Sequence, residues 1–245
     1  MTPGSATAPP NTSSHFASGT KIFHETTLLD RLVKYLSLVG RTSNTPEKLQ
    51  AALCDLMWQQ SYGSVTIDAI CERAGVKKGS FYHAYPDKAA LSLDAFEYFW
   101  ETHSRPWLAA AFSPTEPPLV RIATWLATGI HKSKECQSIH GELHGCPLFN
   151  IGSEISTLEP AVAEKVTEIL RRSRSFLTST LRDAIAENNL DLDDPEEISR
   201  DVFTLVQGAI TQGRITNKLA PIERLPISVA RLLGTTLPSA HSLTV

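Results

Sequence analysis

The chain has 245 residues, 42% of them hydrophobic, and a net charge of −3, which allows one large domain or two modest ones with a proper core. This weak charge argues against bulk non-specific nucleic-acid binding, and no apolar run approaches the roughly 20 residues of a membrane-spanning helix. The N-terminal segment lacks the charged and apolar parts of a signal peptide, so we expect a soluble, cytoplasmic protein without a membrane partner.

Residues 1–43 combine a tail with an amphipathic segment. The first part, residues 1–20, is rich in Ser, Thr, Pro and Ala, a composition typical of disorder. Residues 22–39 place Leu and Val side chains at helical spacing, which predicts an extra helix. Its apolar stripe favours packing against a neighbouring domain or subunit. The alternative role is an arm that carries basic residues, Arg41 among them, to a DNA minor groove.

A small helical domain is predicted over residues 44–92. Its first helix opens with Thr45 as the cap and Pro46 at the first helical position, and Gly63 ends it. The apolar face of this helix should form a small core, which Cys54 and Trp58 support. That face comprises Leu49, Ala52, Leu53, Leu56 and Met57.

Residues 64–91, SVTIDAICERAGVKKGSFYHAYPDKAAL, contain a helix-turn-helix pattern. Thr66 is a good cap for a short helix, and Gly75 follows that helix where a left-handed residue turns the chain. A second helix begins near Lys77, and Phe81 anchors it in the core. This layout predicts that the outward face of the second helix reads DNA.

The outward face carries side chains suited to DNA contact. Residues 73–88 hold four Lys or Arg residues against one Asp, a local balance of +3 in an otherwise acidic chain. Lysines neutralise phosphates, and hydroxyl and imidazole groups donate to phosphates or base edges. The alternative is a basic hairpin on the surface of an ordinary helical protein. The predicted DNA contacts are Arg41, Thr66, Lys77, Lys78, Gly79, Ser80, Tyr82, His83 and Lys88.

The segment GVKKGSFYHAYPDKAAL resembles the recognition helix and following helix of TetR-family transcriptional regulators, and residues 45–91 resemble their DNA-binding domain. The resemblance implies an all-α homodimer. Its N-terminal three-helix helix-turn-helix domain would bind DNA, and its C-terminal helical domain would bind a ligand and dimerise. The implied partners are double-stranded operator DNA and a small-molecule effector. We expect no cofactor and no metal.

The second domain is predicted over residues 93–236, followed by a loose tail at 237–245. A connecting helix opens at Pro86 and runs to about residue 104. Pro106 and three later prolines then break the chain and mark the domain junction.

Two long helices of this domain carry the argument for a dimer. They open at Pro160 and Pro195 and have more apolar surface than one neighbour needs. The resemblance implies that such a pair builds a four-helix bundle with its copy, and Gly208 and Gly213 would allow close approach. The alternative is a monomeric core.

The four cysteines, at positions 54, 71, 136 and 146, lack the paired spacing of zinc ligands and should be free thiols. Cys146 lies between Gly145 and Pro147, which suits the start of a helix, where the dipole lowers a thiol pKa. In some TetR relatives a cysteine in a similar stretch senses oxidants or electrophiles, and Cys136 would then be a resolving partner. The alternative is a small buried residue.

The simpler ligand site is an apolar and aromatic pocket between helices. Its candidate residues are equally suited to an ordinary core. Asn150 and Glu154 either hold a polar end of the ligand or cap helices. The predicted ligand contacts are Trp100, Trp107, Trp125, Cys146, Phe149, Asn150 and Phe176.

These patterns favour a ligand-responsive, sequence-specific transcriptional repressor that a small molecule releases from its operator. The alternatives are a repressor that senses redox change or electrophiles through Cys146, and a DNA-binding protein without an effector. No Ser/His/Asp motif, phosphate-binding glycine loop or metal spacing appears in the sequence, so an enzyme is not expected.

Overall fold

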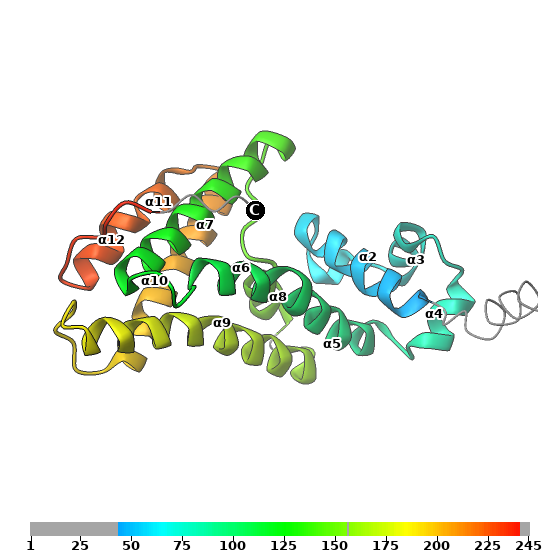
Figure 1. Ribbon diagram of the computed structural model, residues 1–245. Coiled ribbons are helices and arrows are strands. Elements are labelled where there is room, and N and C mark those ends of the chain that lie inside the picture. The colour runs from blue at the N-terminus through cyan, green and yellow to red at the C-terminus, as the bar shows by residue number, and fades with distance from the viewer. Residues whose placement is uncertain (1–43, 156, 241–245) are drawn as a thin grey trace, which may run out of the picture. The chain divides into compact units, whose positions relative to one another are not determined.

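The computed structural model describes residues 44–155 and 157–240, and every regular element in those ranges is a helix (Figure 1). The expected all-α fold is therefore confirmed. None of the described helices combines the length and apolar character that crossing a bilayer requires. The helix predicted over 22–39 lies outside the described residues.

Helix α2 (Thr45–Gln59) begins and ends near the predicted positions, with two differences. Asn44 is its cap residue, so Thr45 already lies inside the helix, and Pro46 occupies the first turn as expected. The helix ends at Gln59, before the predicted end at Gly63. Gly63 lies instead in a separate 3-10 turn, η1 (Tyr62–Ser64). The predicted core face is confirmed, since its five side chains are all buried: Leu49, Ala52, Leu53, Leu56 and Met57.

The helix-turn-helix consists of α3 (Ile67–Ala74) and α4 (Lys78–Ala84), as predicted. The Thr66 hydroxyl accepts a hydrogen bond from the backbone N–H of Ala69 at 3.1 Å, which caps α3. Gly75 has φ +64°, the left-handed conformation that ends α3 and turns the chain. Phe81 is fully buried and fixes α4 to the core.

The connecting helix is longer than predicted. Helix α5 (Lys88–Phe99) starts after Asp87, whose carboxylate accepts from Ala90 N–H at 2.8 Å, and Pro86 precedes it. A π-helical turn, η2 (Trp100–Ser104), and α6 (Arg105–Ala111) follow without a break. Pro106 therefore does not end the helix. It lies in the first turn of α6, where its missing N–H is tolerated, directly after the wider turn of η2.

The rest of the described chain forms long and short helices. Each of the four longer segments opens with a proline, whose fixed φ suits the first helical position. The segments are α7 (Pro118–His140), α8 (Pro147–Ile155), α9 (Pro160–Ala186), α10 (Pro195–Thr216), α11 (Ala220–Glu223) and α12 (Leu225–Leu232).

One hydrophobic cluster runs from α2 through α5 to α9 and α10. Helix α5 packs against α2 on one side and against α9 on the other. An ion-pair network strengthens the second contact. Arg172 of α9 binds both carboxylate oxygens of Glu97, at 2.8 and 2.6 Å, and Lys165 also reaches this carboxylate. Hydrogen bonds from Arg172 and Lys165 hold the pKa of Glu97 far below its usual range, at about 2.

The two glycines of α10 have different surroundings. A Cβ on Gly213 would lie 2.8 Å from Ile222 Cδ1 and 3.2 Å from the Lys218 carbonyl oxygen. A Cβ on Gly208 would meet no described atom within 4 Å. Gly213 therefore allows a close approach within the chain, to Ile222 of α11 and to the Lys218 carbonyl, whereas the expected approach to a second copy stays a prediction.

We expect Gly213→Ala to lower the free energy of unfolding by about 1–3 kcal/mol, because the added methyl overpacks against Ile222 and a backbone carbonyl. Gly208→Ala is the matched control on the same helix, and it should leave stability unchanged or raise it by up to about 1 kcal/mol. Chemical denaturation of both variants measures the difference. Equal effects at the two positions would contradict the packing at α11.

Candidate nucleic-acid interface and ligand pocket

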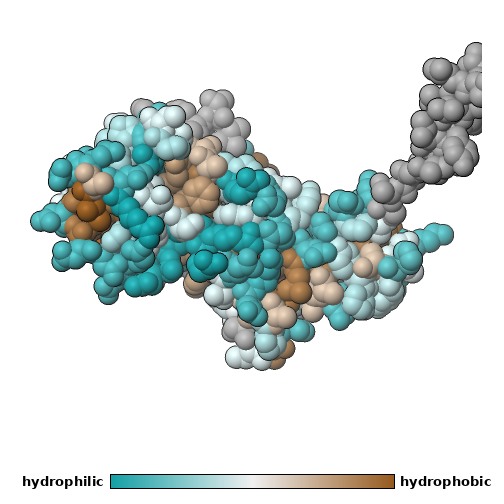
Figure 2. Space-filling model, turned by 60° about the horizontal axis from the view of Figure 1, so that its bottom comes forward, coloured by the Kyte–Doolittle hydropathy of each residue, from teal (hydrophilic) through white to brown (hydrophobic). Residues whose placement is uncertain are grey.

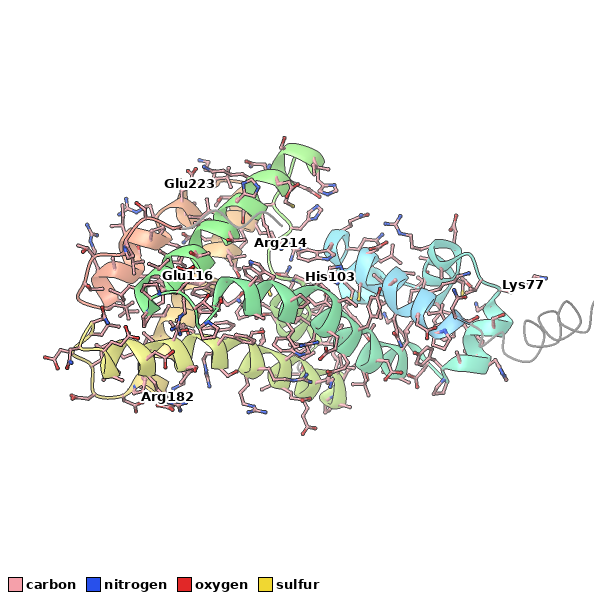
Figure 3. All side chains as sticks on the ribbon, in the orientation of Figure 1. Lys77, His103, Glu116, Arg182, Arg214 and Glu223 are labelled. Atoms are coloured by element: carbon pink, nitrogen blue, oxygen red, sulfur yellow. The ribbon has the colours of Figure 1, made fainter. Side chains whose placement is uncertain are left out.

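The outward face of α4 forms a continuous exposed surface, which we call the reading surface. Lys77 projects from the start of α4 in Figure 3. Tyr82 is 52% exposed, and its ring packs edge-on against the buried Phe81 ring, with centroids 5.3 Å apart. The structure thus brings together six of the nine predicted DNA contacts, all exposed: Lys77, Lys78, Gly79, Ser80, Tyr82 and His83.

The surroundings of Lys78 and Gly79 show how far contacts within the chain constrain these two residues of the reading surface. Lys78 Nζ lies 2.8 Å from Asp68 Oδ1, and both side chains are exposed, so this ion pair contributes little to stability. A Cβ on Gly79 would meet nothing within 4 Å, so packing within the described chain does not require glycine there.

The other predicted DNA contacts are placed differently. Arg41 lies outside the described residues. The Thr66 hydroxyl oxygen accepts the bond that caps α3, which leaves its own O–H able to donate to a phosphate. Lys88 donates to the carbonyl oxygens of Tyr62 at 2.7 Å and Val65 at 2.9 Å, and its ammonium lies 4.1 Å from the Tyr62 ring centroid. Burial lowers the pKa of Lys88. These internal partners support a structural role for Lys88 and give no support to a phosphate contact.

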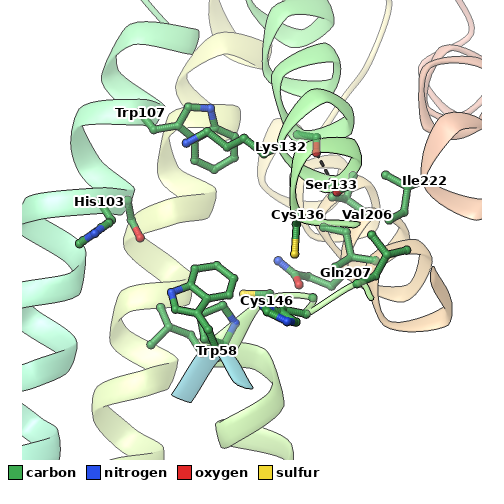
Figure 4. A pocket seen from close by; sticks show the side chains of 18 of the residues that line it. Trp58, His103, Trp107, Lys132, Ser133, Cys136, Cys146, Val206, Gln207 and Ile222 are labelled. Carbon is green, nitrogen blue, oxygen red and sulfur yellow. Dashed lines mark hydrogen bonds between the residues drawn. The ribbon is translucent and has the colours of Figure 1, made fainter. Parts of the chain in front are cut away.

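A pocket of about 630 Å³ lies between α2, η2, α6, α7 and α10, and the loop before α8 completes its wall (Figure 4). This volume suits a small organic ligand. Three tryptophans line it, namely Trp58 from α2, Trp107 from α6 and Trp125 from α7. The pocket therefore takes residues from the DNA-binding helices as well as from the rest of the chain.

The structure places three of the seven predicted ligand contacts on this pocket: Trp107, Trp125 and Cys146. The other four, Trp100, Phe149, Asn150 and Phe176, do not line it. Trp100 lies beside Phe176 and under the Arg172 guanidinium, with ring centroids 6.4 Å apart in the aromatic pair. The Asn150 amide donates to the His144 carbonyl at 3.1 Å, so it supports the loop before α8.

Several lining residues were not predicted. Polar side chains recur on one face of α7 at a spacing of three or four residues, and this pattern was visible in the sequence. Trp58 and Gln207 gave no such signal, because only the fold brings α2 and α10 together. The unpredicted polar and aromatic lining residues are Trp58, His103, Lys132, Ser133, His140 and Gln207.

Cys146 lies at the start of α8, where its carbonyl accepts from Asn150 N–H at 3.0 Å. The predicted lowering of its thiol pKa is wrong. Burial raises the pKa of Cys146, and this effect outweighs the backbone N–H groups of Phe149 and Leu148 and the Gln207 amide, which favour the thiolate. Cys136 lines the same pocket, and its Sγ donates to the Glu142 carbonyl at 3.5 Å.

Glu154, in the last turn of α8, connects this helix to the DNA-binding helices. Its two carboxylate oxygens accept from the backbone N–H groups of Tyr62 at 2.8 Å and Gly63 at 2.7 Å. Charge-assisted bonds of this kind are stronger than neutral ones. Helix α8 therefore starts at the pocket wall and ends on η1, directly before the Thr66 cap of α3.

Comparisons with known proteins agree with this arrangement. The family model of bacterial regulatory proteins of the tetR family matches residues 49–95, and that of the tetracyclin repressor-like C-terminal domain matches residues 126–227. Transcriptional regulator AcuR of Cereibacter sphaeroides is 26% identical over 165 residues, which cover 67% of this chain and 74% of AcuR. The transcriptional repressor NemR of Escherichia coli K12 is 22% identical over 193 residues, covering 78% and 95%.

Two solved structures have the same fold. The regulatory protein TetR from Rhodobacter sphaeroides has a TM-score of 0.67 and 25% identity, covering 78% of this chain and 99% of its own. The reduced form of E. coli NemR has a TM-score of 0.68 and 20% identity, covering 80% and 100%. A helix-turn-helix joined to a larger helical domain defines a DNA-binding transcriptional regulator. The chain belongs to the TetR family of these regulators.

Lys78 and Lys88 provide a matched test of the interface. Lys78→Ala should weaken DNA binding at all sequences and reduce the slope of log affinity against log salt by about one per contact, while stability hardly changes. Lys88→Met should leave the salt slope unchanged and lower the free energy of unfolding by about 1–3 kcal/mol, because two carbonyls lose their donor. Fluorescence anisotropy at several salt concentrations and denaturation measure both. A reduced salt slope for Lys88→Met would show that Lys88 does contact a DNA phosphate.

Proposed function

We propose that the chain is a repressor that binds operator DNA as a homodimer and leaves it when a small molecule occupies the pocket. The observation that carries this proposal is the path from the pocket to η1. Cys146, Pro147 and Leu148 line the pocket at the start of α8, and Glu154 near its end holds the backbone of η1. A ligand that displaces α8 therefore also displaces the turn that leads into α3.

The change is a shift between two populated states. In the DNA-binding state both α4 helices of the dimer match the two half-sites of the operator. A ligand that binds more tightly to a state with α8 displaced lowers the affinity of the protein for its operator. The size of this decrease is limited by the ratio of the ligand's affinities for the two states. The division into a DNA-binding domain at 44–92 and a ligand-binding and dimerisation domain at 93–236 belongs to this proposal.

Apolar surface supports the dimer. In the view of Figure 2 the surface is mostly hydrophilic and hydrophobic residues gather in separate patches. Ile215 at the end of α10 is 77% exposed, and Ile227 and Leu232 of α12 are 54% and 37% exposed. Because α10 and α12 pack against each other, we infer that a partner subunit covers these side chains.

The relatives support the regulatory role, since NemR is a transcriptional repressor and AcuR a transcriptional regulator. The thiol-sensing alternative has weaker support, because burial raises the pKa of Cys146 and a thiol reacts through its thiolate. An effector-independent protein has no evident use for a pocket that contacts both the DNA-binding helices and α8.

The proposal is tested with an operator recovered by selecting genomic fragments on the purified protein. A compound library is then screened for quenching of tryptophan fluorescence, because three of the four tryptophans line the pocket. We expect pocket-binding compounds to weaken the operator complex about 5–150-fold, the usual range of allosteric coupling. Compounds that bind without changing operator affinity would support the effector-independent alternative. Compounds that tighten operator binding would show that the ligand is a co-repressor and does not release the protein from its operator.

Glu154→Ala tests the path through α8. The variant should bind pocket compounds with unchanged affinity, but their effect on operator affinity should fall towards none, because η1 is no longer held by α8. Hydrogen exchange at the Tyr62 and Gly63 amides should become faster. Glu164→Ala, which removes an equal charge from an exposed position on α9, is the control. Full coupling in Glu154→Ala together with faster exchange would show that the signal takes another path.

A further inference from the structure

Two buried polar atoms on the pocket wall have no hydrogen-bond partner in the part of the chain that the structure describes. They are Trp107 Nε1, a donor, and Gln207 Oε1, an acceptor. The Gln207 side chain is only 8% exposed. Buried polar groups in proteins nearly always have partners, so one free donor from α6 and one free acceptor from α10 in the lining of the same pocket point to a ligand that supplies both partners.

The donor side of the pocket also carries a cation. Lys132 Nζ lies 5.1 Å from the centroid of the Trp107 ring, and Figure 4 shows the two side chains together. Burial lowers the pKa of Lys132, and the carboxylate of Glu135, three residues further along α7, offsets only part of this effect. Within residues 44–155 and 157–240 no carboxylate forms an ion pair with Lys132. Arg73, the other strong cation on the wall, is paired with Asp55 at 3.3 Å.

We propose that the effector is an apolar monocarboxylic acid whose carboxylate binds Lys132 and Trp107 Nε1, and whose hydroxyl or amide N–H donates to Gln207 Oε1. This inference rests on the proposed function, since it names the effector class of the same pocket. One ammonium and one N–H suit a single carboxylate, whereas a phosphate dianion is usually bound by more donors, such as clustered arginines. Trp58, Trp125 and Leu126 provide an apolar wall for the hydrocarbon part.

The test uses a defined series of probes on the full-length protein. The series is the 4-hydroxyphenyl alkanoic acids from the acetic to the pentanoic acid, because the separation of acid and hydroxyl is then varied stepwise. Each acid is compared with its primary amide, which keeps the shape and loses the charge. It is also compared with the phenyl acid that lacks the hydroxyl. Titration calorimetry gives Kd for every compound up to its solubility limit.

Three variants assign the contacts. Lys132→Met keeps an apolar stem and removes the ammonium, whereas Lys134→Met removes a charge from the same helix at a residue paired with Glu223, outside the pocket. Gln207→Leu removes the acceptor at similar volume. Thermal denaturation of each variant establishes that it is folded before titration.

We expect at least one acid to bind about tenfold or more tightly than its amide, the size typical of a charge-assisted contact. Lys132→Met should abolish this preference and Lys134→Met should retain it. Gln207→Leu should abolish the preference for the hydroxylated acid over the phenyl acid. The proposal is overturned if no acid binds, if amides bind as well as acids, or if the preference survives Lys132→Met.

The same titrations separate this inference from the proposed function when operator DNA is added. An acid that binds with the expected preference and leaves operator affinity unchanged would contradict ligand-induced release while supporting the chemistry of the site. A neutral compound that binds in the pocket and releases the operator would support the proposed function and contradict the anionic effector.

Discussion

Helix α5 is the element on which the rest of the structure depends, because α2 packs against one side of it and α9 against the other. Its apolar side chains belong to the same cluster as α2 and α9, and the Glu97 carboxylate is held by Arg172 and Lys165 of α9. A close-packed interior does not deform gradually. Helix α5 therefore joins the packing of α9 directly to the packing of α2.

The pocket contacts the DNA-binding helices by two connections. The first is the π-turn η2, which continues α5 and presents His103 and Ser104 to the pocket. π-turns often mark functional positions in helices. The second is α8, whose start lines the pocket and whose Glu154 holds η1. One connection leads to the end of the helix-turn-helix and the other to its beginning, so the pocket lining is joined to both sides of α3 and α4.

Local rules made the helix-turn-helix predictable. The Thr66 cap, the left-handed Gly75 and the buried Phe81 each follow from a few neighbouring residues. The boundary errors at Gly63 and Pro106 arose where distant contacts or an unusual turn decide the structure. The pocket was predicted only in part for the same reason, because Trp58, Trp107 and Gln207 come from three helices far apart in the sequence. Periodicity identifies a buried face but not the element opposite it.

The two unpartnered polar atoms in the pocket lining lower the stability of the fold and at the same time offer hydrogen bonds to a ligand. Each unpartnered buried group, such as Trp107 Nε1 or Gln207 Oε1, destabilises the fold by about 1–3 kcal/mol relative to a partnered one. An apolar residue at Gln207 would avoid this penalty. A ligand that pairs both atoms recovers the lost stability on binding, so the penalty in the free state becomes selectivity for that ligand. The fold is therefore less stable with these two groups unpartnered than it would be with apolar side chains in their place, a cost that the proposed role of the pocket in ligand binding would explain.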